Sequence, residues 1–283
     1  MRFDHLELGD NQIWFSRNRS QVSYPESGND TCFEVEDESF WFHHRNHCIL
    51  GCLQNYPPPG TVFDIGGGNG FVSAAIEKHG YEAVLVEPGI AGAQNAHRRG
   101  LTNVICSTLE DAGFEPHSLP AVGIFDVLEH IDDDQGFLGQ LRQAIRPDGR
   151  LYVTVPAYPW LWSVDDDFSG HARRYTRGRL IRDIAQAGFE VEYSTYFFAA
   201  LPLPIFLTRT LPGRLSIRNT SNSGGGAREH VSRQRVAGPL QAISTGNAGR
   251  SRPSGGSPLE AVCCWSPDQP QSEHSSAPRH RKG

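Results

Sequence analysis

The fold is decided by the stretch Val62–Gly70, with the sequence Val-Phe-Asp-Ile-Gly-Gly-Gly-Asn-Gly. An apolar run typical of a buried strand breaks into glycines at the alternate positions Gly66, Gly68 and Gly70. Glycine adopts backbone conformations that other residues avoid, and it lets the chain come close to a bound ligand. Residues 71–79 have a helical pattern. The stretch therefore predicts the strand, glycine turn and helix that open a nucleotide-binding α/β sheet.

A second apolar run, residues 83–86, ends in Glu87, and nucleotide-binding folds place a ribose-binding acid at a similar distance from the turn. The pattern Asp-x-Gly-x-Gly-x-Gly at residues 64–70 resembles motif I of the class I S-adenosylmethionine-dependent methyltransferases. Dinucleotide-binding folds place the third glycine one residue later. The resemblance implies that S-adenosylmethionine (SAM) is the cofactor and contacts the three glycines. It also implies that Glu87 binds the ribose and that Asp64 lies near the methionine end.

Strands and helices alternate in the next part of the chain, with a helix expected at residues 90–99 and strands at 103–106 and 122–128. This alternation predicts a Rossmann-like, doubly wound, mostly parallel sheet with helices on both faces. In the family that the chain resembles, an Asp after strand three hydrogen bonds to the adenine. The matching residue here is Thr108, so its hydroxyl or the Leu109 backbone is expected to meet the adenine.

The fourth strand leads into Phe-Asp-Val-Leu-Glu-His-Ile at residues 125–131. This segment resembles motif IV of small-molecule methyltransferases, including the ubiquinone-biosynthesis O-methyltransferases, some of which hold a divalent cation with acids and a His at matching positions. One interpretation is that Asp126, Glu129 and His130 form a metal site. In the other, Asp126 caps the strand, Glu129 makes a structural contact and His130 faces the pocket as a base. We favour the second interpretation, count Asp126 with the cofactor-binding residues, and take His130 as the first choice for the catalytic base.

Two later segments are candidates for binding the methyl acceptor, because loops at this edge of the sheet carry specificity. One is an aromatic loop at residues 156–163, which either lines the acceptor pocket or forms a lid over the N-terminal arm. Its candidate contacts are Tyr158, Trp160 and Trp162. The other begins at His171, the second choice for the base. Arg173 and Arg174 either clamp an acceptor carboxylate or phosphate or pair with the acidic residues 165–167.

We divide the chain into an N-terminal arm (1–38), a methyltransferase domain (39–212) and a tail (213–283). Most of the arm is polar and shows no sustained period, so it is predicted to be irregular. The tail is rich in Ser, Gly, Pro and Arg and poor in large apolar residues, which predicts disorder. The seventh strand of the family's sheet is then expected to be degraded or missing, and residues 259–265 are the candidate for a degraded strand. A shift of the reading frame near residue 213 is an alternative origin of this composition.

The net charge of −6 is unevenly distributed, since residues 1–212 carry −12 and the tail carries +6. An acidic body disfavours nucleic acid as a partner and favours a small-molecule acceptor. The N-terminus lacks a signal-peptide pattern, and the six cysteines lack paired metal spacing, so free thiols and a cytoplasmic location are expected. The apolar run at 196–207 is too short to span a bilayer, although it is compatible with peripheral membrane contact or with an apolar substrate pocket.

These observations predict an enzyme that transfers a methyl group from SAM to an oxygen, nitrogen or carbon atom of a small molecule. A divalent metal is considered as a second cofactor besides SAM but is not favoured. The sequence does not indicate the oligomeric state. One alternative is a nicotinamide-dependent oxidoreductase, which the glycine spacing disfavours. Neither Lys78 nor Lys282 has a Tyr four residues before it, as short-chain reductases require. The other alternative is a SAM-binding protein that has lost catalysis through its altered C-terminal region.

Overall fold

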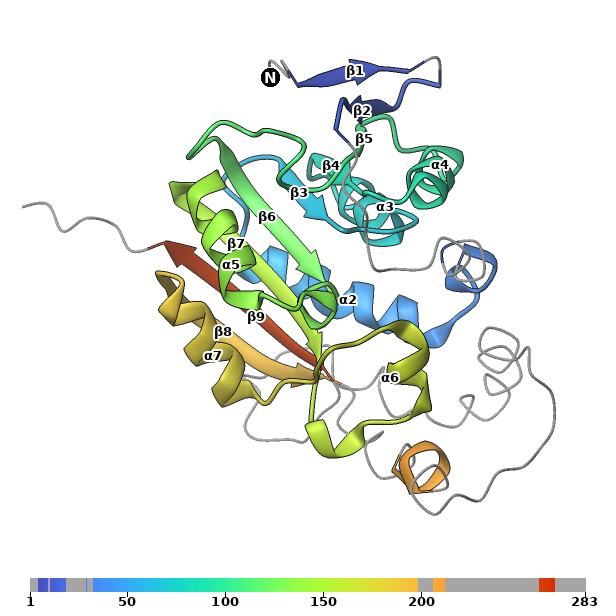
Figure 1. Cartoon of the computed structure of the whole chain (residues 1–283), viewed down its shortest axis with the longest axis vertical. Coiled ribbons are helices and arrows are strands. Elements are labelled where there is room, and N and C mark those ends of the chain that lie inside the picture. Colours follow the sequence, from blue (N-terminus) through green and yellow to red (C-terminus); the bar gives the residue numbers. More distant parts are fainter. Residues whose placement is uncertain are drawn as a thin grey trace, which may run out of the picture.

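The structure, a computed structural model, describes residues 5–9, 11–18, 29, 33–197, 206–211 and 260–267. In this part of the chain, nine strands form one sheet in the order β1-β2-β5-β4-β3-β6-β7-β9-β8 (Figure 1). The strands are β1 (Leu6–Leu8), β2 (Trp14–Ser16), β3 (Val62–Ile65), β4 (Ala83–Val86), β5 (Val104–Cys106), β6 (Leu119–Phe125), β7 (Ile145–Pro156), β8 (Phe189–Phe197) and β9 (Glu260–Pro267). The helices are α2 (Phe40–Asn55), α3 (Phe71–Lys78), α4 (Ile90–Arg98), α5 (Asp134–Ala144), α6 (Val164–Ser169) and α7 (Arg177–Gln186), with short turns η1 (Leu128–His130), η2 (Pro159–Leu161) and η3 (Phe206–Thr210).

The centre of the sheet is parallel. Along the order β2-β5-β4-β3-β6-β7, each strand is parallel to the next. At the two edges, β1 is antiparallel to β2, and β9 is antiparallel to both β7 and β8. The strand order reverses between β3 and β6, because the chain first builds β4 and β5 on one side of β3 and then crosses to the other. Doubly wound sheets bind ligands at the carboxyl ends of the strands beside such a switch point. The predicted Rossmann-like, mostly parallel architecture is confirmed.

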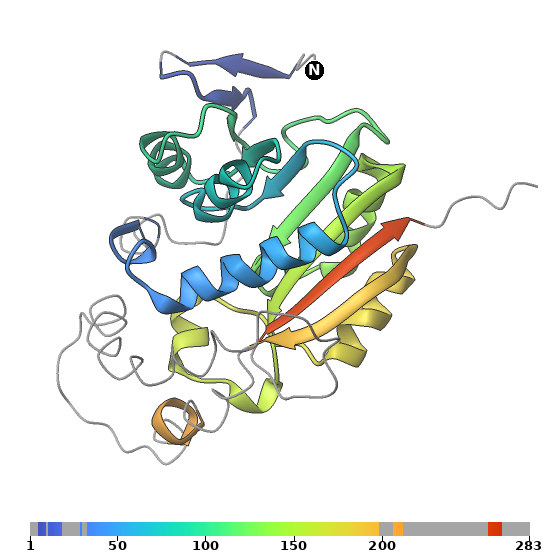
Figure 2. The same cartoon turned by 180° about the vertical axis from the view of Figure 1, so that it is seen from behind.

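Helices cover both faces of this sheet. Helix α2 crosses one face, and α5 and α7 lie on the opposite face (Figures 1 and 2). The core under α2 also includes side chains of α3, namely Val72 and Ile76, packed with Val62 and Tyr152 of the sheet. The core under α5 and α7 centres on the inner positions of β3, β6 and β7. These two apolar layers hold the carboxyl ends of β3, β4 and β6 in fixed relative positions.

β9 is the seventh strand of the methyltransferase-like sheet. It coincides with the candidate run 259–265 and inserts between β7 and β8, with Cys263 paired to Val153 on one side and to Ser194 on the other. The expectation that this strand is missing is therefore wrong, and eight residues of the tail complete the sheet. The rest of the tail, and the prediction of its disorder, lie outside the described residues.

The described part of the N-terminal arm also differs from the prediction of an irregular segment. β1 and β2 form a hairpin, and β2 extends the sheet by pairing in parallel with β5, with Trp14 opposite Ile105. Ile13 is fully buried beside α4 and β5, so apolar burial fixes this hairpin to the domain. Its strands are three residues each, too short for a period of two to stand out in the sequence.

Cysteine chemistry and membrane contact were both predicted from the sequence. Cys48 and Cys106 are in the thiol form, but Cys52 is disulfide-bonded, so the expectation that the cysteines are thiols is wrong at that position. Within the described residues, no helix has the length and apolar character needed to cross a membrane. Much of the apolar run at 196–207 lies outside those residues, so peripheral membrane contact stays a prediction.

Candidate active site

The glycine turn connects β3 to α3 at the carboxyl end of the central strand. Gly66, Gly68 and Gly70 have φ angles of 71°, 56° and 71°, in the left-handed region that favours glycine. A Cβ atom at Gly70 would lie 2.4 Å from Cδ1 of Leu101. Among the described residues, a Cβ atom at Gly68 would meet no atom closer than 3.8 Å. The turn is therefore packed against the protein at Gly70 and has open space at Gly68, where a ligand can approach.

Asp64 is fully buried in β3, beside this turn. Its Oδ2 atom accepts a hydrogen bond from the Ser73 hydroxyl at 2.6 Å, whereas its buried Oδ1 atom has no hydrogen-bond partner in the described part of the chain. Burial raises the pKa of Asp64 to about 6, although the Ser73 hydrogen bond and Arg45 oppose the shift. A buried acceptor without a donor is costly, so this position suits a ligand that brings a donor, such as an ammonium group.

Glu87 follows β4 and faces the same turn. Its Oε2 atom accepts from the backbone N–H of Gly68 at 2.8 Å, and its Oε1 atom accepts from the N–H of Gly89 at 2.7 Å. Burial raises the pKa of Glu87 to about 7, against the lowering effect of these two hydrogen bonds. Each oxygen keeps a second lone pair. The carboxylate can therefore hold the turn and still accept hydrogen bonds from two ligand hydroxyls.

The arm contributes Asn29 to this region, a residue that sequence reasoning missed. Its carbonyl accepts a hydrogen bond from Asn69 of the glycine turn at 2.8 Å, and its side-chain nitrogen lies 3.1 Å from the position of a Cβ atom at Gly89. An ion pair between Glu36 and Arg99, with a nitrogen–oxygen distance of 2.8 Å, holds the following part of the arm to the domain. Asn29 and Asn69 are 40 residues apart, so no local pattern indicates their contact.

Asp126 stands at the carboxyl end of β6, across the switch point from the glycine turn. Its φ of 58° is uncommon for a residue with a side chain. The carboxylate accepts from the Thr154 hydroxyl at 2.8 Å and pairs with Arg45 of α2 at 2.6 Å. The backbone N–H donates to the Thr154 carbonyl at 3.0 Å. These contacts agree with the interpretation of Asp126 as a cap of the strand.

The two histidines predicted to be catalytic lie next to each other and to Glu129. Glu129 and His130 are in η1, directly after β6, and His171 follows α6. The imidazole centroids are 4.8 Å apart. Burial and the neighbouring charge of Asp126 raise the pKa of Glu129 well above its usual value. Burial, together with His171, lowers the pKa of His130 to about 4, so its imidazole is neutral near pH 7.

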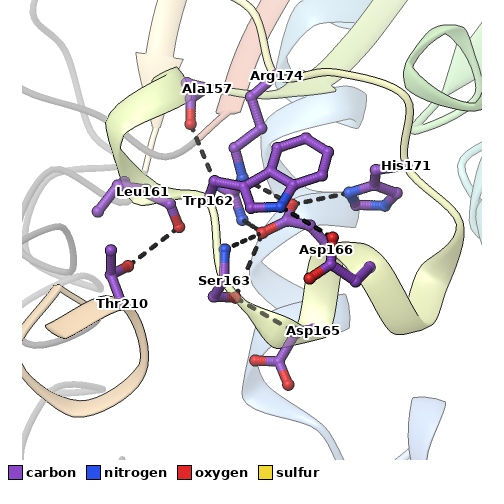
Figure 3. A network of polar contacts seen from close by, with 10 residues as sticks. Ala157, Leu161, Trp162, Ser163, Asp165, Asp166, His171, Arg174 and Thr210 are labelled. Atoms are coloured by element: carbon purple, nitrogen blue, oxygen red, sulfur yellow. Dashed lines mark hydrogen bonds and ion pairs between the residues drawn. The ribbon is translucent and has the colours of Figure 1, made fainter. Parts of the chain in front are cut away.

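Asp166 of α6 fixes the orientation of His171 (Figure 3). His171 Nδ1 lies 2.8 Å from Oδ1 of Asp166, and Arg174 donates to both oxygens of the same carboxylate, at 2.7 Å and 3.0 Å. Burial acts to raise the pKa of Asp166, but the hydrogen bonds from His171 and Arg174 outweigh it and lower the pKa to about 2. Asp166 is thus ionised and can only accept, so Nδ1 of His171 carries a proton and donates it to this carboxylate.

A comparison with known protein families shows to which family the chain belongs. A family model described as a methyltransferase domain matches residues 42–194. The chain belongs to this methyltransferase family. The match spans the glycine turn, Glu87, Asp126 and both histidines, so the predicted membership of the class I SAM-dependent methyltransferases is confirmed. The finer likeness to ubiquinone-biosynthesis enzymes stays a prediction.

Solved structures of methyltransferases share the fold. Phosphoethanolamine N-methyltransferase 2 of Haemonchus contortus, solved with SAM, has a TM-score of 0.56 and 17% identity, and the match covers 88% of this chain and 59% of that one. This chain therefore spans about three-fifths of its length. A Thermotoga maritima protein described as a possible histamine N-methyltransferase has a TM-score of 0.53 and 16% identity, over 86% of this chain and 96% of that one. A geranyl diphosphate methyltransferase with SAM has a TM-score of 0.51 and 16% identity, covering 79% and 85%. No curated protein sequence matches the chain.

The methyltransferase has a tight turn where adenine binding is predicted. The Thr108 hydroxyl accepts from the backbone N–H of Asp111 and donates to its carboxylate, both at 3.0 Å. Leu109 is buried in the main core. The Thr108 hydroxyl is thus engaged within its own turn, and Asp111 is an additional carboxylate that the sequence pattern did not single out. The contact of Thr108 or Leu109 with adenine stays a prediction.

The two arginines considered for binding an acidic acceptor are paired inside the methyltransferase. Arg174 binds Asp166, as the salt-bridge alternative predicted. Arg173 binds Asp134 of α5 and the carbonyl of Asp132 instead of the acidic residues 165–167. The Arg173 pair attaches the segment that follows α6 to the start of α5, and the Arg174 pair attaches it to α6 itself. They stabilise the wall of the site on which His171 is placed.

The aromatic loop of the methyltransferase contacts β8 and η3 within the described residues. Tyr158 stacks on Tyr196 at 5.3 Å between ring centroids, and Trp160 makes an edge contact with Phe206 at 5.6 Å. Trp162 donates from its ring nitrogen to Asp167 at 3.0 Å. Trp160 remains 44% exposed. These contacts place the loop beside the carboxyl ends of the strands, and its role in acceptor binding stays a prediction.

Proposed function

We propose that this methyltransferase transfers a methyl group from SAM to an oxygen, nitrogen or carbon atom of a small-molecule acceptor. The observation that supports it best is the Glu87 carboxylate, hydrogen-bonded to the open position Gly68 at the switch point of the sheet. A buried acid beside a glycine turn at this place can bind the ribose of a nucleoside cofactor. The family match makes a methyl donor the relevant cofactor.

The residues present fit SAM, which supplies an activated methyl group on its sulfonium. Glu87 would accept from the two ribose hydroxyls, and the buried Oδ1 of Asp64 would accept from a donor at the methionine end. Thr108 and Leu109 would hold the adenine, and Asp126 would lie beside the reacting end. The protein's main task is then to hold the acceptor atom in line with the methyl carbon.

His130 and His171 are suited to removing a proton from the acceptor. Burial lowers the pKa of His130 to about 4, so its imidazole is unprotonated and free to accept a proton at neutral pH, but it is a weaker base than an imidazole with a pKa near 7. His171 is positioned by Asp166, as bases in many active sites are positioned by a carboxylate. Either imidazole can accept the proton from a hydroxyl or amine that reaches the carboxyl end of β6.

The acceptor is proposed to be a small molecule. The acidic body disfavours nucleic acid, and two structural neighbours are named for small acceptors, phosphoethanolamine and geranyl diphosphate. Since Arg173 and Arg174 are both paired with carboxylates, they give no reason to prefer an anionic acceptor. The alternative of a non-catalytic binding protein rested on an incomplete sheet, and β9 removes that reason.

A transfer assay tests this proposal. The full chain, given SAM labelled in its methyl group and the small-molecule fraction of a cell extract, should produce S-adenosylhomocysteine and a labelled small molecule. His130→Asn should lower the transfer rate about 100-fold or more, the usual effect of losing a general base. Its affinity for S-adenosylhomocysteine should not change.

The exposed His79 provides the matched control, because His79→Asn changes the same side chain at the end of α3, outside the site. Label found only in macromolecules would contradict the small-molecule acceptor. An unchanged rate in His130→Asn would contradict the role of His130 as the base.

A further inference from the structure

We propose that Glu129, His130 and His171 form a binding site for a divalent transition-metal ion with the ligand preferences of Zn²⁺. Each of the three residues offers one ligand atom, and these atoms all lie within 4.8 Å of one another. Two imidazole nitrogens and one carboxylate oxygen are a common protein ligand set for zinc, in which a fourth position stays open for water or substrate. Glu129 and His130 follow β6, and His171 follows α6, so the fold brings the ligands together from two segments.

The state of Glu129 points to an absent partner. Its side chain is buried, with 1% of the residue exposed, and its Oε2 atom has no hydrogen-bond donor among the described residues. A buried carboxylate oxygen without a donor is strongly unfavourable unless a cation or a hydrogen bond compensates it. A metal ion between Glu129 and the two imidazoles would provide that compensation.

Both histidines have the hydrogen bonds that hold metal-binding imidazoles. His171 donates Nδ1–H to the ionised Asp166 at 2.8 Å, and Arg174 fixes this carboxylate with two hydrogen bonds (Figure 3). One ring nitrogen of His130 donates to the backbone carbonyl of Gly170. Metal-binding histidines usually donate their second N–H to a carboxylate or a backbone carbonyl, which fixes the ring and directs the other lone pair at the ion.

The surrounding structure makes the site compact. The backbone N–H of Ala172 donates to the Glu129 carbonyl at 2.7 Å, which ties the two ligand-bearing segments together. Ligands of tetrahedral zinc, at about 2.1 Å from the ion, lie roughly 3.4 Å from one another. The ligand atoms, which lie within 4.8 Å of one another, would therefore have to approach each other by about 1 Å to bind the ion.

The ligand set differs from the oxygen-rich one that the sequence suggested. Asp126 is not part of it, because its carboxylate is engaged by Arg45 and Thr154. His171 takes its place, and a second imidazole shifts the preference from Mg²⁺ toward zinc-like ions. A nitrogen bonded to a metal cannot also accept a proton, so the ion and the proposed base role compete for the same lone pairs. Metal binding itself does not depend on the proposed methyl transfer.

Cobalt provides a direct test, because Co²⁺ in a four-coordinate site absorbs visible light much more strongly than hydrated Co²⁺. The full chain, without an added histidine tag and without SAM, should bind one equivalent of Co²⁺ with intense visible absorption. Zn²⁺ should displace it, and Mg²⁺ should not. His171→Ala and the isosteric Glu129→Gln should each weaken Co²⁺ binding by more than about tenfold.

His47→Ala is the matched control, since His47 is exposed on α2 in a His-rich stretch and is not one of the three proposed ligands. It should leave the Co²⁺ spectrum unchanged. Asp166→Asn, which retains both imidazoles but removes the charged partner of His171, should weaken binding by about 10-fold or more. The proposal is overturned if the wild-type chain gives only the weak spectrum of hydrated Co²⁺. It is also overturned if Glu129→Gln and His171→Ala, both folded by circular dichroism, bind Co²⁺ as tightly as the wild type.

Discussion

Gly68→Ala should bind SAM about 100-fold or more weakly than the wild-type chain while the domain stays folded. The new Cβ atom would meet no atom of the described residues closer than 3.8 Å, so this part of the chain has room for it. The φ of 56° adds a backbone penalty of about 1–2 kcal/mol for a residue other than glycine. A cofactor lying against the turn would lose the space that the alanine side chain takes. It would also lose its close contacts with the backbone of the turn.

Gly80→Ala is the control for backbone strain. Gly80 has a φ of 86°, its Cβ atom would also have no atom of the described residues within 4 Å, and it follows α3 away from the turn. Both variants should lose a similar free energy of unfolding in chemical denaturation. Only Gly68→Ala should lose cofactor affinity, measured by calorimetric titration. Equal affinity in the two variants would show that the cofactor does not lie against Gly68.

Glu87→Ala should weaken SAM binding by at least about tenfold, because hydrogen bonds to a charged group contribute about 1.5–3 kcal/mol. The variant also removes the acceptor that holds the N–H groups of Gly68 and Gly89. Glu82→Ala is the matched control, since Glu82 lies at the other end of β4 and is exposed. If calorimetry showed the same affinity for SAM in Glu87→Ala and Glu82→Ala, Glu87 would be excluded from the site.

The pKa of Glu87 adds a pH dependence to this prediction. Ribose hydroxyls donate to an ionised carboxylate, and burial raises the pKa of Glu87 to about 7 in the free protein. Ligand binding therefore has to expel a proton at low pH, and affinity should rise as the pH increases from 6 to 8. Glu87→Gln should bind more weakly and lose this rise, so that the remaining dependence centres on Asp64, whose pKa is about 6.

The local parts of this site could be predicted from the sequence. β3, the glycine turn and α3 are contiguous, and each is specified by its own residues, namely an apolar run, glycines with positive φ and a helical period. Glu87 was predictable for a similar reason, since the end of a parallel strand next to β3 must lie at the same edge. Asp64 followed from its position directly before the turn.

Features that depend on distant pairing were not predictable. The run that forms β9 could be recognised as a strand candidate, but its insertion between β7 and β8, across a long stretch of unrelated composition, could not. Asn29 contacts a turn 40 residues away, and Arg45 pairs with Asp126, which is 81 residues away. The preference of Arg173 for Asp134 over its acidic neighbours also depends on how the segment after α6 lies beside the start of α5, which local spacing does not encode. Such contacts follow from the folded arrangement and not from residue type alone.

The central claim is that the turn at Gly68 and the carboxylate of Glu87 form the site of a SAM-dependent methyltransferase. Calorimetric titration of the full chain with S-adenosylhomocysteine tests it most directly, because this ligand shares the adenine, ribose and amino-acid groups of SAM and cannot react. We expect one binding site per chain, strongly weakened by Gly68→Ala and Glu87→Ala, and no binding of NAD. Absence of S-adenosylhomocysteine binding, or binding that neither variant alters, would contradict the account.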